Sequence, residues 1–212
     1  MSKRKKTTLR IFPDNWIDPF DFKALFPHPE YPLEIDIGSG KGRFLAARSG
    51  NFPHINFLGI ERQRLRVDQA GRRCERANRK NVRLLRMEGY YAIRYLIPVD
   101  YVDTYYFFYP DPWPKARHHD NRLFNPAFMD ALHRTLKEGG CLHVSTDHLP
   151  YFEEILTLLE NDSRFQKIET FVPSDEERTD FELIFHDKKP GRCSFKKSST
   201  SEQNTMPKVT AM

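Results

Sequence analysis

The sequence predicts an α/β fold in which a mostly parallel sheet of seven strands carries helices on both faces. Three observations support this prediction: short apolar stretches alternate with helical ones, the 212 residues are enough for one well-packed domain, and several apolar stretches run directly into acids, glycines or prolines. In such sheets ligands bind at the carboxyl ends of the strands, so we look there for a functional site.

Seven stretches are expected to form the strands, the sixth being the weakest of them. They are residues 33–37 (LEIDI), 55–60 (INFLGI), 82–87 (VRLLRM), 104–109 (TYYFFY), 141–146 (CLHVST), 165–171 (FQKIETF) and 181–186 (FELIFH).

Two of the intervening helices have clear sequence patterns. Asn125 is suited to cap the first, Pro126 to begin it, and the pair Gly139-Gly140 to end it. The second runs from about residue 150 to 160 and places apolar residues on one face, namely Phe152, Ile155, Leu156 and Leu159.

Composition divides the chain into three parts. Residues 1–12 are expected to be a flexible basic arm, 13–189 a single domain, and 190–212 a disordered polar tail. The formal net charge is +5, and residues 62–86 hold ten Arg or Lys against two acids. This distribution favours a polyanionic partner, although the basic helix expected at 62–80 is equally compatible with a solvated surface.

The cysteines and the hydropathy pattern exclude several classes. Three widely spaced cysteines indicate neither a disulfide framework nor a zinc site, and we expect no bound metal. No apolar run is long enough for a membrane helix, and the basic N-terminus lacks the apolar segment of a secretory signal. A cytoplasmic protein is the simplest interpretation.

The first predicted strand runs into a glycine-rich turn, LEIDIGSGKGR. A dinucleotide fingerprint would need glycine at position 43, which is Arg43, and a phosphate loop cannot be placed here. The remaining pattern, Asp36 followed by Gly38, Gly40 and Gly42, resembles the first motif of S-adenosylmethionine-dependent methyltransferases, in which the acid faces the ammonium group of the cofactor. A tight turn without a ligand is the simpler alternative.

Acids also follow the next two strands. Glu61 lies about 20 residues beyond the glycines, where a carboxylate accepts hydrogen bonds from ribose hydroxyls. Glu88 ends the third strand, and in the methyltransferases that this pattern resembles the same position contacts the adenine side of the cofactor. Each acid alone is an ordinary surface carboxylate; three at successive strand ends indicate a cofactor site.

The fourth strand runs into PDPWPKAR. The prolines stop the strand and fix Asp111 near the expected methyl donor, Trp113 offers a face for a base, and Lys115 and Arg117 are suited to phosphates or base oxygens. A proline-rich loop around a buried Trp explains the indole and leaves the two cations unexplained.

Three motifs in order resemble the bacterial single-chain tRNA (guanine-N7)-methyltransferases: DPWPKARH at 111–118, STD at 145–147 and TDFE at 179–182. The resemblance covers roughly residues 30–187 and implies a Rossmann-like class I methyltransferase fold. It implies cofactor binding by the glycine turn and by Asp36, Glu61, Glu88 and Asp111, with Asp111 also the catalytic acid. The residues it implies for guanine binding are Lys115, Asp147, Thr179, Asp180, Phe181 and Glu182.

The sequence departs from this family at three places. The family often has Glu at the position of Asp36, two basic residues at the position of Asn121-Arg122, and no long tail after the last strand. These differences bear on affinity more than on the type of reaction.

The resemblance implies methyl transfer from S-adenosylmethionine to N7 of a variable-loop guanine, position 46, in tRNA. Because N7 carries no proton, His118 and His119 are not required as bases. Two alternatives remain: a methyltransferase acting on another RNA base or on a small molecule, and a noncatalytic RNA-binding protein with a relict cofactor fold. We expect a monomer or homodimer that does not bind membranes.

Overall fold

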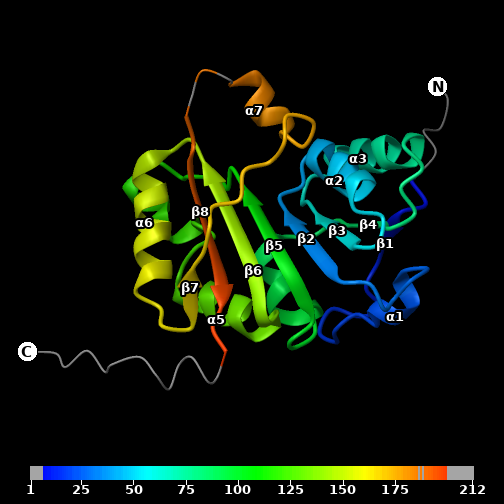
Figure 1. Cartoon of the computed structure of the whole chain (residues 1–212), viewed down its shortest axis with the longest axis horizontal. Coiled ribbons are helices and arrows are strands. Elements are labelled where there is room, and N and C mark those ends of the chain that lie inside the picture. Colours follow the sequence, from blue (N-terminus) through cyan, green and yellow to red (C-terminus); the bar gives the residue numbers. More distant parts are fainter. Residues whose placement is uncertain (1–6, 186, 188, 200–212) are drawn as a thin grey trace, which may run out of the picture.

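Eight strands form one sheet in the computed structural model, which describes residues 7–185, 187 and 189–199. Their spatial order is β1-β4-β3-β2-β5-β6-β8-β7, and β8 runs antiparallel to both of its neighbours (Figure 1). The strands are β1 (Arg10–Ile11), β2 (Leu33–Ile37), β3 (Asn56–Ile60), β4 (Val82–Leu85), β5 (Val102–Phe108), β6 (Leu136–Thr146), β7 (Phe165–Lys167) and β8 (Gly191–Lys197).

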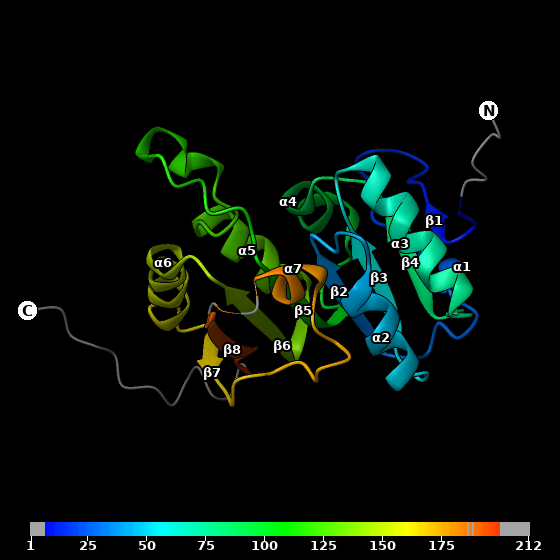
Figure 2. The same cartoon turned by 90° about the horizontal axis from the view of Figure 1, so that it is seen from above.

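Helices cover both faces of the sheet, as predicted (Figure 2). Neighbouring strand residues separate the two faces: Phe57 packs with α2 and α3, whereas Leu58 belongs to the larger core that α5 and α6 cover. The helical elements are α1 (Phe22–Leu25), α2 (Arg43–Asn51), α3 (Arg64–Arg76), α4 (Gly89–Tyr91), η1 (Ala92–Leu96), η2 (Ala116–Asn121), α5 (Pro126–Thr135), α6 (Leu149–Glu160) and α7 (Asp180–Ile184).

The expected start of α5 is confirmed, whereas its expected end is wrong. The side chain of Asn125 accepts a hydrogen bond from the backbone N–H of Phe128, and Pro126 opens the helix. The helix ends at Thr135, and Gly139 and Gly140 lie inside the long strand β6. On α6, Ile155 and Leu159 are buried as expected, together with Tyr151.

The seventh predicted strand is wrong. Residues 180–184 form the helix α7, because Thr179 and Glu182 make a capping box: each side chain accepts a hydrogen bond from the other residue's backbone N–H. A short apolar run cannot be assigned by periodicity alone, whereas the spacing Thr-x-x-Glu marks a helix start. The sixth predicted strand is present but limited to Phe165–Lys167.

Both ends of the domain extend further than expected. Residues 190–199 were expected in a disordered tail, yet 191–197 form β8, in which Cys193 and Phe195 are buried and supply the apolar alternation of a strand. In the arm, Arg10 and Ile11 pair with β4. The sheet therefore has eight strands in place of seven, and the rest of both tails, 1–6 and 200–212, lies outside the described residues.

The centre of the sheet is the natural place for a ligand. Strand β2 lies between β3 and β5, both parallel to it, and the chain order reverses there. Loops leaving β2 and β5 diverge to opposite faces at such a switch point and leave a crevice at the carboxyl ends of the strands. Helix α7 lies above those ends (Figure 1).

Candidate functional site, a pair of adjoining cavities

Four strand ends meet in a cavity of about 510 Å³. Its wall includes Gly38 after β2, Glu61 after β3, Glu88 after β4 and Asp111 after β5. These are four positions that the sequence pattern selected, so the fold brings them together as expected. We call this space the donor cavity.

Glycine is needed in this turn for two different structural reasons. Gly38, Gly40 and Gly42 have φ values of +78°, +54° and +71°, which other residues rarely adopt. A Cβ on Gly38 would meet no heavy atom within 4 Å, so the backbone is open to a ligand there. A Cβ on Gly42 would lie 2.7 Å from Cβ of Ala70, so that glycine lets α2 pack against α3.

Asp36 is a buried carboxyl group at the end of β2, only 4% exposed, and the next residue, Ile37, lines the donor cavity. Burial and, secondarily, the Glu61 carboxylate raise its pKa to about 7. No ion pair or hydrogen bond of its side chain is seen among the described residues. A buried carboxyl group of this kind fits the ammonium group of S-adenosylmethionine, which would stabilise its ionised form.

Glu61 and Glu88 are both fixed by neighbouring backbone. Glu61 is 5% exposed, accepts from the N–H of Gln63 at 2.7 Å and lies 3.7 Å from the guanidinium of Arg66. Glu88 caps α4 by accepting from the N–H groups of Tyr90 and Tyr91. Each keeps lone pairs for a ligand, and Glu88 also has a structural role as a helix cap.

The loop after β5 is exposed and contains strained backbone. Asp111 has 67% of its side chain exposed and lies 3.4 Å from the guanidinium of Arg62. Tyr109 and Trp113 have φ values of +56° and +43°. Strain of this kind at non-glycine residues is concentrated at functional sites, and both residues line the donor cavity.

A second cavity, of about 210 Å³, adjoins the first. Tyr109 lines both, and Asp147 and Glu182 line the second, together with Phe181 and Arg192. The ring of Tyr109 lies against that of Phe181 with 4.4 Å between centroids. Burial and the nearby Glu182 carboxylate raise the pKa of Tyr109, which keeps its phenol neutral. We call this space the acceptor cavity.

The TDFE run is held by ion pairs to helix α3 and to strand β8. Asp180 accepts from both terminal nitrogens of Arg73, at 2.9 and 3.3 Å, and Glu182 accepts from Arg192 at 2.8 Å. Thr179 is occupied as the N-cap of α7. Of the four residues selected in this run, Phe181 and Glu182 line the acceptor cavity, whereas Thr179 and Asp180 hold the helix in place.

The remaining selected residue lies apart. Lys115 is exposed and precedes the short helix η2, and it is not among the described residues that line either cavity. Next to it, the ring of Trp113 makes an edge contact with His118 at 5.8 Å.

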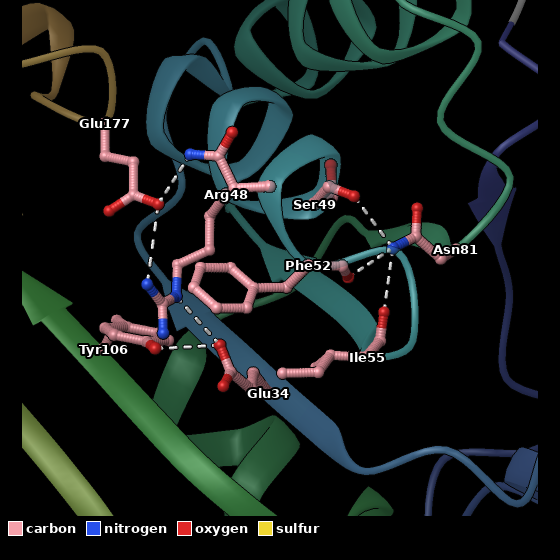
Figure 3. A network of polar contacts seen from close by, with 9 residues as sticks. Glu34, Arg48, Ser49, Phe52, Ile55, Asn81, Tyr106 and Glu177 are labelled. Atoms are coloured by element: carbon pink, nitrogen blue, oxygen red, sulfur yellow. Dashed lines mark hydrogen bonds and ion pairs between the residues drawn. The ribbon is translucent and has the colours of Figure 1, made fainter. Parts of the chain in front are cut away.

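The loop before α7 is anchored by a buried polar network (Figure 3). Arg48 on α2 donates to Glu34 at 3.1 Å and to Glu177 at 3.5 Å, and the hydroxyl of Tyr106 donates to Glu34 at 2.8 Å. The guanidinium also lies 5.0 Å from the ring centre of Phe171. These contacts fix residues 171–177 against the sheet and so set where α7 begins.

Sequence reasoning missed three residues that shape the site: Arg48, Tyr109 and Arg192. Arg48 stands in a helix without a motif, and Arg192 lies in the segment expected to be a tail. Tyr109 was identifiable, because it is the last residue of the aromatic strand before Pro110. Among the described residues, no helix is long and apolar enough to cross a membrane, and no cluster of His, Cys, Asp or Glu suits a metal.

Comparison with known proteins agrees with this geometry. A family model described as "Putative methyltransferase" matches residues 30–187. A 16S rRNA methyltransferase, KamB, has the same fold, with a TM-score of 0.63 at 12% identity over 86% of this chain and 95% of that one.

Two curated relatives are named tRNA (guanine-N(7)-)-methyltransferase. The protein from Halorhodospira halophila is 37% identical over 67% of this chain, which spans 63% of its length, less than two thirds. The protein from Nitrosococcus oceani is 33% identical over 84% of this chain and 78% of its own length. The chain therefore belongs to the tRNA (guanine-N(7)-)-methyltransferase family.

Proposed function

We propose that this protein transfers a methyl group from S-adenosylmethionine to N7 of a guanine in tRNA, the variable-loop guanine at position 46. We also propose that the enzyme is cytoplasmic and acts as a monomer or homodimer. Family membership supports the reaction type, and the arrangement of the two cavities supports the chemistry.

One observation carries the proposal: the donor and acceptor cavities meet at Tyr109. A direct methyl transfer needs the two reactants in contact and aligned, and holding them so is the main source of rate in such a reaction. A ligand in each cavity would lie on either side of the same residue, with Asp111 next in the chain after Pro110.

Residues in the wall of the donor cavity and directly beside it would divide the cofactor between them. The Asp36 carboxylate would pair with the ammonium group, Glu61 with the ribose hydroxyls and Glu88 with the adenine side. Gly38, Gly40 and Gly42 would form the turn beside the ligand, with Gly38 presenting open backbone to it. When bound, the cofactor supplies an activated methyl group.

In the acceptor cavity, the residues suit a guanine. Phe181 and Tyr109 offer aromatic surfaces, and carboxylates accept from guanine N1 and N2, where adenine offers no matching donors. The two oxygens of Glu182 already accept from Thr179 and Arg192, but each has a second lone pair. Asp147 stands in the same wall, and we propose that these two acids read the base edge while Lys115 approaches its phosphate.

Catalysis on N7 requires little from the protein beyond position and charge. The N7 lone pair lies in the ring plane and carries no proton, so no base needs to remove one. The product ring is cationic, and a carboxylate near it stabilises the growing charge. We propose that Asp111 has this role, with Asp147 as a second contributor.

The decisive experiment is incubation of the protein with unmodified tRNA and labelled S-adenosylmethionine, followed by mapping of the methylated nucleotide. N7-methylguanosine at position 46 is the expected result. Label at another base would favour the alternative methyltransferase. Calorimetry that detects tRNA binding without cofactor binding would favour a noncatalytic RNA-binding protein.

A further inference from the structure

A third cavity, of about 410 Å³, adjoins the donor cavity. It shares Arg62, Met87 and Glu88 with the donor cavity. Its other wall comes from residues 10–16, and below the N-terminal arm is taken to extend to residue 16. The charged and the large aromatic residues of its wall are Arg10, Phe12, Trp16, Arg62, Arg86 and Glu88.

The arm that forms this wall is fixed to the domain. Thr8 donates its backbone N–H to Glu75 on α3 at 2.7 Å, and β1 pairs with β4. Farther along, the hydroxyl of Tyr91 donates to the carbonyl oxygen of Trp16 at 2.6 Å. The side chains of the arm are therefore presented from an ordered backbone.

Two large aromatic side chains stand exposed on this ordered arm. Phe12 is 61% and Trp16 63% exposed, although both line the cavity. Aromatic rings that are held in place and left in solvent beside a cavity offer stacking surfaces, and any nucleobase stacks on such a ring. The rings thus favour a flat ligand.

The cavity is also cationic. Among the described residues, its lining holds three arginines and one acid: Arg10, Arg62, Arg86 and Glu88. The guanidinium of Arg10 lies 4.5 Å from the ring centre of Phe12, and its Nε is buried without a hydrogen-bond partner among the described residues. Burial and, secondarily, the neighbouring Arg86 lower the pKa of Arg10, whereas Asp68 opposes the shift. The arginines of this wall would attract an anion.

We propose that this cavity binds one unstacked nucleotide of the RNA substrate, with its base against Trp16 and Phe12 and its phosphate near Arg10 and Arg86. The inference rests on the proposed function, because the bound RNA is the tRNA to be methylated. It adds a second point of contact, on the arm, to the guanine in the acceptor cavity. Two separated contacts would fix the orientation of the RNA over the donor cavity.

The cofactor is the other ligand to consider, since the two cavities share a wall. S-adenosylmethionine has no phosphate and bears a positive sulfonium, so an arginine cluster does not suit it. The donor cavity alone, at about 510 Å³, is within the range that holds a ligand of that size. The charge of the third cavity therefore favours RNA.

Three variants test the proposal: Trp16→Ala, Arg86→Gln and, as a control, Lys23→Gln. Lys23 is an exposed cation on α1, whose Phe22 stacks on Tyr101 at the amino end of the sheet. The dissociation constant of unmodified tRNA is measured at several salt concentrations, and that of S-adenosylmethionine by calorimetry.

We expect Trp16→Ala to weaken tRNA binding about 5- to 100-fold, in line with the loss of one stacked base. Arg86→Gln should reduce the salt slope by about one counterion. Both should leave cofactor binding unchanged, and Lys23→Gln should leave both ligands unchanged. Weakened cofactor binding by Trp16→Ala would overturn the proposal in favour of an adenine site.

The test separates this subsite from the proposed function. Equal tRNA affinity of the parent and of both variants would overturn the subsite alone, provided that the parent methylates tRNA. A parent that neither binds nor methylates tRNA would overturn the proposed function and the subsite with it.

Discussion

Arg73 on α3 forms a bidentate ion pair with Asp180 at the start of α7. Its two terminal nitrogens donate to the two carboxylate oxygens at 2.9 and 3.3 Å. Bidentate pairs of this type fix geometry as well as contribute energy. The sequence alone left the basic helix expected at 62–80 open between a surface that meets a polyanion and a solvated surface. The structure gives Arg73 a different task, which is to hold α7 over the acceptor cavity.

The first prediction separates these roles. Arg73→Gln should release α7 and lower turnover at saturating tRNA, because Phe181 and Glu182 lose their fixed position. Arg76→Gln, on the exposed face of the same helix, should reduce tRNA affinity and flatten its salt dependence with turnover unchanged. Steady-state kinetics at several salt concentrations would show the difference. Identical effects of the two changes would mean that Arg73, like Arg76, contacts RNA phosphates and does not position α7.

A second prediction concerns Asp36 and the cofactor. Since its pKa is about 7 in the free protein, the carboxyl is increasingly protonated below that pH and cannot pair with the ammonium group. Affinity for S-adenosylmethionine should therefore rise with pH and level off above 7, and well below 7 the change should approach tenfold per pH unit. Calorimetry from pH 5.5 to 7.5 measures this. Asp36→Asn should bind weakly at every pH, and a pH-independent parent would contradict the assignment.

The raised pKa of Asp36 also predicts how the stability of the free protein depends on pH. Stability should fall as pH rises, whereas cofactor affinity should increase. The folded-state pKa of about 7 exceeds the ordinary value of 3.8, so the folded protein binds more protons between these pH values. Stability is thus lost as pH rises from about 4 to 7, on the order of a few kcal/mol. Asp36→Asn should melt at a higher temperature than the parent at pH 8 and near the parent at pH 4. Equal melting temperatures at pH 8 would show that Asp36 is not destabilising.

Features of the fold and the site could be predicted from the sequence where a local pattern marks them. Gly38, Glu61, Glu88 and Asp111 were identifiable because each lies within three residues of the end of a strand, and parallel strands bring their ends together. Strand β8 was missed because Lys196 and Lys197 give it a polar composition, although Cys193 and Phe195 face the core. Arg192 lies in β8 and was therefore missed as well. Ion pairs such as Arg73 with Asp180 join residues 107 positions apart, and no local pattern reveals them.

A further prediction addresses the buried polar network around Arg48, which fixes residues 171–177 against the sheet. Arg48→Met would leave Glu34 and Glu177 buried without their cation, their side chains being 8% and 5% exposed. Breaking a buried pair in this way typically costs about 3–5 kcal/mol, so chemical denaturation should show a large loss of stability. Arg76→Met, an exposed position, is the matched control. A change no larger than that of the control would mean that Glu34 and Glu177 find other partners.

The last prediction bears on Asp111 and on how the reaction is catalysed. Asp111→Asn keeps the shape of the side chain and removes its charge near the developing cation. Losing one electrostatic stabiliser of this kind costs on the order of a hundredfold in rate, and the loss should appear in single-turnover measurements more than in tRNA affinity, which phosphate contacts dominate. At saturating cofactor, where Asp36 is already ionised, the parent's rate should be flat across neutral pH because no proton is removed. His118→Gln and His119→Gln are the controls, and both should retain that flat profile. A steep rise with an apparent pKa near 6.5, abolished by either histidine change, would instead establish a histidine base and end the electrostatic account.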